Sequence, residues 1–269
     1  MLANRGPGRL GLLVAVLAVV RCGAAQFCSF WDSSCIDPLA QSAVRMDFSP
    51  LFQDPITFYY AFDASPSGKG EGPMTKTAFW LRYNDHRVKT DPIDENRTSE
   101  VALRVGNLTG TPSGANNGCD GFLGPRCSDN IKSALQTLMY RHAVSDDSYA
   151  KPLEYALNQL LSSSSSSISS SCATAVLDVA SIPVQEFAVE QTSNHNTTLM
   201  TPGSPSDPWQ VWYLDQMTAH QQANQVAVGI ISRGPSHHST PQRPSDFQIE
   251  LVCVQAPNSR QGSSSKGAH

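Results

Sequence analysis

The chain has 269 residues, of which 40% are hydrophobic and 16% charged, and this composition suits a globular protein with one good core or two small ones. Without the three arginines of residues 1–25, 16 basic residues remain against 23 acidic ones, a net charge of −7. This sign disfavours nucleic acid or an anionic membrane surface as the main partner.

Residues 1–25 have the features of a signal peptide. Arg5 and Arg9 supply positive charge, residues 10–20 are uncharged and mostly aliphatic, and residues 23–25 are small. The apolar run is shorter than the roughly twenty residues that span a bilayer, so we expect cleavage and no membrane span. The sequence therefore predicts a secretory-pathway or extracellular protein.

The cysteines support an oxidising compartment. One of the seven, Cys22, lies in the predicted leader, and six remain: Cys28, Cys35, Cys119, Cys127, Cys172 and Cys253. An even number predicts three disulfides, for which fifteen pairings are possible. Closeness in sequence favours Cys28–Cys35 and Cys119–Cys127, which leaves Cys172–Cys253. There is no C-x-x-C and no histidine at zinc spacing, so we expect no metal.

Three N-glycosylation triplets follow the leader. They begin at Asn96, Asn107 and Asn196, and all lie in polar, loop-like sequence. Together with a signal peptide, they predict that at least one carries a glycan.

Most of the chain alternates hydrophobic and polar residues with the period of β-strands. The runs lie at residues 44–48, 56–62, 77–83, 101–105, 173–179, 184–190, 209–214, 225–231 and 247–254. Period-two patterns between Pro/Gly/Ser turns indicate a mainly β protein, an antiparallel sandwich or barrel of jelly-roll type.

Two short helices are expected between these strands. The first begins at Ser128 or Asp129, and the second covers residues 151–161. The serine-rich residues 162–171 are interpreted as a surface loop rather than a linker, so that residues 26–257 form a single domain. Residues 258–269 are polar and predict a disordered tail.

Signatures of common enzyme classes are missing from the sequence. There is no G-x-S-x-G, phosphate loop, dinucleotide fingerprint or H-E-x-x-H, and we expect no cofactor. Asp91, Asp94 and Glu95, or Asp146 and Asp147, are the acidic groups available for a glycosidase pair. Adjacent acids in loops are more often solvated surface, so this is a weak indication.

Two clusters of aromatic and polar residues are the strongest candidates for a binding site. They span residues 79–86 and 209–215, with a histidine beyond the second. From them we take Arg82, His86 and Tyr213 as catalytic candidates, and Trp80, Tyr83, Trp209, Trp212 and His220 as substrate-binding candidates. The alternative is that these aromatic side chains fill the core of the sandwich.

A resemblance to a known group lies between these clusters. Residues 106–127 read GNLTGTPSGANNGCDGFLGPRC and precede the first expected helix. This stretch resembles small secreted fungal glycoproteins, some of which are similar to hetero-Diels–Alderases of natural-product pathways. The resemblance covers about thirty residues. It implies a cyclase that joins a polyketide-derived quinone methide to a terpene alkene, and it assigns no catalytic residue.

Three functions are therefore open. A cycloaddition needs two partners held in a reactive geometry and one of them polarised, which an apolar pocket with an Arg, His or Asn donor can provide without a cofactor. The first hypothesis is such a cyclase, acting on a small apolar molecule. The second is a secreted non-catalytic binding protein, such as an effector or cell-wall lectin, and the third is a divergent glycoside hydrolase. The oligomeric state stays open.

Overall fold

The computed structural model describes residues 28–48, 55–68, 70, 72–83, 97–145, 149–162, 172, 177–190, 197–235 and 240–257. The predicted signal peptide, residues 163–171 of the serine-rich segment and the predicted tail lie outside these ranges. Within them, no helix combines the length and hydropathy needed to cross a membrane.

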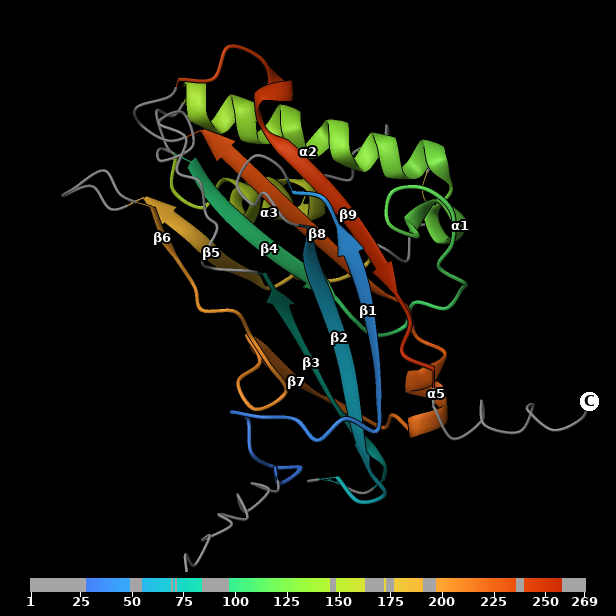
Figure 1. Cartoon of the computed structure of the whole chain (residues 1–269). Helices are drawn as coiled ribbons and strands as arrows, with labels where there is room; N and C mark the ends of the chain where they lie inside the picture. Colours follow the sequence, from blue (N-terminus) through green and yellow to red (C-terminus); the bar gives the residue numbers. More distant parts are fainter. Residues whose placement is uncertain are drawn as a thin grey trace, which may run out of the picture.

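In the described part of the chain, nine antiparallel strands form two separate sheets (Figure 1). The four-stranded sheet has the order β1 (Ala40–Met46), β2 (Ile56–Ser65), β3 (Met74–Arg82), β7 (Gln210–Asp215). The five-stranded sheet has the order β6 (Thr197–Leu199), β5 (Val184–Glu190), β4 (Arg97–Arg104), β8 (Ala227–Pro235), β9 (Gln248–Val254). The expectation of a mainly β protein is confirmed, and the strand pairing of the described residues does not close a barrel. The strand expected at residues 173–179 is wrong where it is described, because residues 177–179 form no strand and include a turn and a bend.

The two sheets share one hydrophobic cluster. Phe58, Phe79 and Leu81 contribute to it from the four-stranded sheet, and Phe187 and Ile231 contribute from the five-stranded sheet. Each of these side chains is at most 1% exposed. Successive strand residues point to opposite faces, so the period-two pattern of the sequence places one set of apolar side chains between the sheets.

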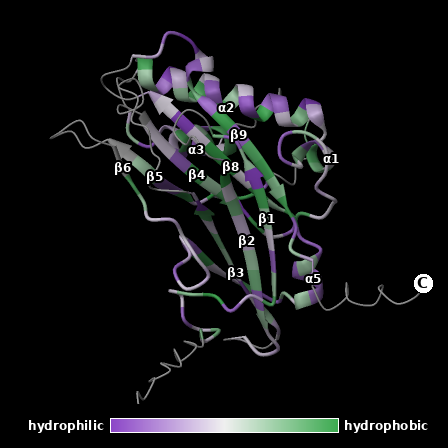
Figure 2. Ribbon diagram, in the orientation of Figure 1, coloured by the Kyte–Doolittle hydropathy of each residue, from purple (hydrophilic) through white to green (hydrophobic). Residues whose placement is uncertain are grey.

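Helices cover the other face of the five-stranded sheet. The long helix α2 (Pro125–Ser145) crosses over β8 and β9, and α3 (Pro152–Ser162) packs against it (Figure 1). In Figure 2 the strands beneath α2 are largely hydrophobic, whereas α2 alternates between hydrophilic and hydrophobic residues. Leu135, Leu153 and Leu251 belong to the cluster that joins these layers.

The expectation of two short helices is wrong in number and length. Four α-helices occur among the described residues, including α1 (Cys119–Leu123) and α5 (Ala219–Ala223), and a 3₁₀ turn covers Pro244–Asp246. Helices of five residues are too short to show a periodic pattern. The first expected helix begins at Pro125 rather than at Ser128 or Asp129, and it runs for 21 residues.

Three disulfides are present, as predicted, but two of the favoured pairings are wrong. The bonds are Cys28–Cys35, Cys119–Cys253 and Cys127–Cys172. Cys119 is the first residue of α1, which contacts β9, whereas Cys127 lies in the first turn of α2. The two neighbours in sequence therefore face different parts of the fold.

The glycine-rich loop that carries the resemblance blocks the outer edge of β9. The Asn117 side chain donates a hydrogen bond to the Leu251 carbonyl at 2.8 Å, and the Asn117 carbonyl accepts one from the Cys253 amide at 3.2 Å. Gly118 has a φ of 90°, and a Cβ atom there would lie 3.0 Å from the Cys253 carbonyl oxygen. Only glycine fits this close approach without strain, which gives the motif a structural role.

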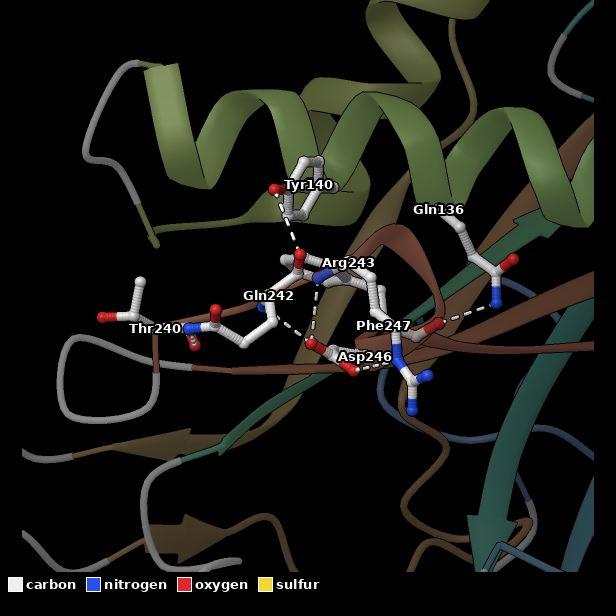
Figure 3. Close-up of polar contacts among 7 residues, drawn as sticks. All are labelled: Gln136, Tyr140, Thr240, Gln242, Arg243, Asp246 and Phe247. Carbon is white, nitrogen blue, oxygen red and sulfur yellow. Dashed lines mark hydrogen bonds and ion pairs between the residues drawn. The ribbon is translucent and has the colours of Figure 1, made fainter.

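The connection between β8 and β9 is fastened to α2 (Figure 3). Asp246 accepts hydrogen bonds from the backbone amides of Gln242 at 2.7 Å and Arg243 at 3.1 Å, and these bonds, led by the first, lower its pKa. From α2, Tyr140 donates to the Gln242 carbonyl at 3.3 Å, and Gln136 donates to the Phe247 carbonyl at 2.8 Å. This polar group serves the fold by setting the start of β9.

A buried carboxylate joins β4 to α3. Glu100 is fully buried and accepts hydrogen bonds from the amides of Leu153 at 2.7 Å and Glu154 at 3.4 Å, which are unpaired donors of the first helical turn. The pKa of Glu100 is raised to about 7, mainly by burial and also by nearby Glu186. The two hydrogen bonds lower the pKa and so oppose this rise. Glu100 therefore acts as a helix cap from a neighbouring strand.

Candidate functional site

The first predicted aromatic cluster is mostly part of the core. Trp80 is 2% exposed, and its ring stacks on Tyr59 with centroids 5.3 Å apart. Tyr83 is 7% exposed and donates a hydrogen bond to the Met200 carbonyl. Tyr83 belongs to the cluster between the sheets, as the core-filling alternative expects, whereas Trp80 is buried in a separate small cluster on the other face of β3.

The second predicted cluster lies at the edge of the space between the sheets. The Trp212 ring stacks on Phe79 with centroids 5.6 Å apart. Trp209 is packed near Phe187 at 5.6 Å and donates its indole N–H to the Thr201 carbonyl at 3.0 Å. Both tryptophans are partly buried and complete the core at edge strand β7.

The catalytic candidates are not brought together. Arg82 is the exposed last residue of β3, whereas Tyr213 pairs with Lys76 near the other end of that strand. Six residues of strand separate the two positions, which corresponds to roughly 20 Å. His220 is exposed on α5, and His86 lies outside the described residues.

A different group of aromatic rings is exposed on the outer side of β7. We call it the aromatic patch, and it consists of Phe30, Trp31 and Tyr213. Trp31 is 44% exposed, and its ring lies 6.0 Å from that of Tyr213 at an angle of 21°. Phe30 packs edge-on against Trp31 at 5.0 Å, and its carbonyl accepts a hydrogen bond from the Tyr213 hydroxyl at 3.1 Å. Burial raises the pKa of Tyr213, so the hydroxyl keeps its proton.

Two features fix the short loop that carries Phe30 and Trp31. The Cys28–Cys35 disulfide closes it. Lys76 is fully buried beneath it, and the Lys76 ammonium group donates hydrogen bonds to the carbonyls of Ser29 at 3.1 Å and Asp32 at 2.5 Å. Burial lowers the pKa of Lys76, while the charges of Asp63 and Asp32 oppose this. The exposed Trp31 ring is therefore held in place by the fold.

An open pocket of about 510 Å³ lies where β4 and β7 end. It is lined by residues 104–107, 178–179, 213–215 and 217, so Tyr213 contributes to both the aromatic patch and this pocket. Arg104 donates to the carbonyls of Val105 and, at 2.6 Å, Gly106. Burial lowers the pKa of Arg104, and Asp178 counteracts this. The pocket combines charged groups with aliphatic side chains.

A second open pocket, of about 470 Å³, lies between β1 and β9. Its walls include Ser42, Val44, Thr111, Asn117 and Gln255, and the described residues that line it include no ionisable side chain. None of these described residues is suited to acid–base chemistry.

The described residues form neither a metal site nor the acidic pair expected for a glycoside hydrolase. No three His, Cys, Asp or Glu side chains gather there as metal ligands would. The acidic residues considered for a glycosidase pair, residues 91, 94, 95, 146 and 147, lie outside the described ranges.

Comparison with known proteins identifies no relative. No family model matches the chain, and neither a curated protein nor a solved structure is significantly similar to it.

Reasoning from sequence found Tyr213 but missed Phe30, Trp31 and the pocket. A signal for the first two existed, because two large aromatic residues stand among small and acidic residues between Cys28 and Cys35. The pocket had no such signal, because its walls come from three separate segments, the first and last of which are more than 100 residues apart in the sequence.

Proposed function

We propose that this chain is a secreted binding protein of lectin type, which recognises carbohydrate through the aromatic patch. The observation that supports this is the Trp31 ring, which is 44% exposed although a disulfide and a buried lysine hold its loop in place. Large aromatic residues held rigidly at a surface are typical anchors of a binding site, because little conformational entropy is lost when a ligand packs on them.

The chemistry around the patch favours a neutral sugar. The C–H face of a pyranose ring packs on an aromatic ring, and neighbouring hydroxyl and carboxylate groups bind the sugar hydroxyls. Asp32 and Ser34 are exposed beside Trp31, and their side chains are 2.7 Å apart. The net charge of −7 after the predicted leader disfavours an anionic polysaccharide. Neutral wall polysaccharides are therefore the proposed ligands.

The proposed location agrees with this ligand. The signal peptide and glycosylation triplets of the sequence remain predictions, and the three disulfides are compatible with them. A protein in an extracellular or secretory compartment meets polysaccharide at the cell surface.

The test is a binding isotherm on insoluble neutral polysaccharides, namely chitin, cellulose and β-1,3-glucan. We expect saturable binding to one of them and at least about a tenfold loss for Trp31→Ala and Tyr213→Ala, equivalent to about 1.4 kcal/mol. Trp31→Phe should retain part of the affinity because it keeps an aromatic face. Val144→Ala, which removes another exposed apolar side chain, is the control and should bind like the parent. Equal binding by the parent and Trp31→Ala would exclude the patch.

A cofactor-independent hetero-Diels–Alderase is the second proposal. It is favoured by one observation, that Tyr213 and Arg104 line the same pocket and thus place an aromatic residue beside a cation. The test supplies a quinone methide precursor and a terpene alkene and measures the enantiomeric excess of the adduct. A racemic product formed at the uncatalysed rate would exclude this activity.

We also propose that the two sheets be classed as an open β-sandwich. The support is the single hydrophobic cluster to which strands of both sheets contribute.

A further inference from the structure

The glycosylation triplet at Asn107 is presented on a tight turn at the end of β4. Gly106 and Asn107 both have positive φ, 86° and 56°. The side chains of Asn107 and Thr109 are exposed, whereas Leu108 between them is 2% exposed. The two side chains that an oligosaccharide transferase must recognise thus remain accessible in the folded chain.

Neighbouring groups fix this turn on both sides. Leu108 accepts a hydrogen bond from the Val226 amide at 2.7 Å, and its own amide donates to the Gln225 side chain at 2.8 Å. Arg104 donates a hydrogen bond to the carbonyl of Gly106, the residue before Asn107, at 2.6 Å. A group attached to Asn107 would therefore leave the protein in a restricted direction.

Asn107 lies at the wall of the pocket where β4 and β7 end. The volume of about 510 Å³ falls in the range, roughly 300–1,000 Å³, that small ligands occupy. Leu214 and Met217 provide apolar wall, and Asp178 and Asp215 provide acceptors for hydroxyl and N-acetyl N–H donors. These are the groups needed to hold an N-acetylglucosamine ring, which has an apolar face and a polar rim.

We propose that Asn107 carries an N-linked glycan and that the first sugar of this glycan lies in the pocket lined by Leu214, Asp215 and Met217. In the transfer, the bond between the anomeric carbon and a lipid pyrophosphate donor breaks. The Asn107 side-chain nitrogen forms the new bond to that carbon and loses one proton, and the lipid pyrophosphate leaves. The pocket is then filled by a group of the same chain, which excludes it as the site of the cycloaddition that we gave as the second proposal. This inference stands independently of carbohydrate binding by the aromatic patch.

The first part of the test is occupancy. The full chain is secreted from a eukaryotic cell, and glycopeptides are analysed by mass spectrometry. We expect Asn107 to be modified in the parent and in Thr109→Ser, and unmodified in Thr109→Ala. These variants are preferable to Asn107→Gln because glutamine is strained at a φ of 56°. An unmodified parent would overturn the proposal.

The second part locates the sugar. The glycan is trimmed enzymatically to its first N-acetylglucosamine, and nuclear Overhauser effects are recorded to ¹³C-labelled methyl groups. Contacts from the sugar to the Leu214 and Met217 methyl groups are expected. Val44, in the other open pocket, is the control and should show none. A modified Asn107 without contacts to Leu214 or Met217 would also overturn the proposal.

The same variants separate this proposal from the function proposed for the patch. Thr109→Ala should lose the glycan and keep the polysaccharide affinity of the parent, whereas Trp31→Ala should lose affinity and keep the glycan. Loss of both properties in Thr109→Ala would show that the pocket and the patch are one site, contrary to their proposed independence.

Discussion

The two faces of the four-stranded sheet use aromatic side chains in different ways. On the inner face, Phe79 is 1% exposed and stacks on Trp212 and Phe58 at 5.6 and 5.9 Å. On the outer face, Trp31 stacks on Tyr213 at 6.0 Å yet is 44% exposed. The ring contacts are similar, so the difference lies in what covers them. The presence of aromatic residues alone therefore does not distinguish a core from a binding surface. An exposed ring whose loop is held by a disulfide and by hydrogen bonds is a better indication of a binding surface.

The disulfides give the largest expected contrast between the two regions. Cys119–Cys253 closes 134 residues and Cys28–Cys35 closes seven. Loop-closure entropy then predicts losses of about 5 and about 2 kcal/mol when each bond is removed by paired Cys→Ala substitutions. Urea unfolding measures both, and equal losses would argue against the entropic origin of this difference.

Removing the Phe79 ring from the inner face has the next largest expected effect on stability. Phe79→Ala leaves a cavity beside Phe58 and Trp212 and should cost about 3–5 kcal/mol of unfolding free energy. Thermal and urea unfolding provide the measurement. A loss below about 1 kcal/mol would mean that the space between the sheets repacks easily, and the inner face would then not differ from the outer one.

The pH dependence of the unfolding free energy tests the contact that Glu100 makes between β4 and α3. Its pKa rises from 4.5 to about 7 on folding, so the folded state binds its proton more tightly than the unfolded state. This contribution is complete below pH 4.5 and is lost as pH rises through 7, a change on the order of 3 kcal/mol. The charges facing it are Glu186, Glu154 and Lys151.

Glu100→Gln should remove that pH dependence while an oxygen acceptor for the Leu153 amide remains. Unfolding free energies of parent and variant between pH 4 and 8 provide the comparison. Parallel curves would show that Glu100 is not the titrating group.

The smallest expected effect on stability comes from removing the Trp31 ring on the outer face. Trp31→Ala should change the unfolding free energy by about 0.5 kcal/mol or less, because the ring lies at the surface, is 44% exposed and belongs to no buried core cluster. A loss comparable to that of Phe79→Ala would assign Trp31 to the core and weaken the binding proposal.

The sequence predicts the strands well because the alternation of side chains along a strand depends only on neighbouring residues. The alternation at residues 77–83 predicts a strand, and in the structure Phe79, Leu81 and Tyr83 belong to the cluster between the sheets while Trp80 belongs to a separate cluster. Alternation does not show what lies above each face. The sequence therefore predicts a ligand contact for Trp80, which is wrong, because the backbone amide of Gly203 bonds to the Leu81 carbonyl and brings another segment over the Trp80 side chain.

The candidate site depended on long-range arrangement and was predicted only in part. Tyr213 was chosen for its aromatic neighbours along the chain, but its partners in space are Phe30 and Trp31, 183 and 182 residues earlier. The pairing of cysteines failed for the same reason, because α1 directs Cys119 toward β9 rather than toward Cys127. Neither result follows from spacing along the sequence.

The Cys119–Cys253 bond has a consequence for the order of oxidation. If the chain is oxidised as it emerges, Cys119 is followed after eight residues by Cys127, whereas its native partner comes 134 residues later. The loop to Cys127 is the shorter of these two, so we expect a Cys119–Cys127 bond to form first, and it would have to be exchanged before Cys119 can bond to Cys253 in β9. Maturation of this protein should therefore depend on thiol shuffling, and a host without a disulfide isomerase should accumulate the mispaired form.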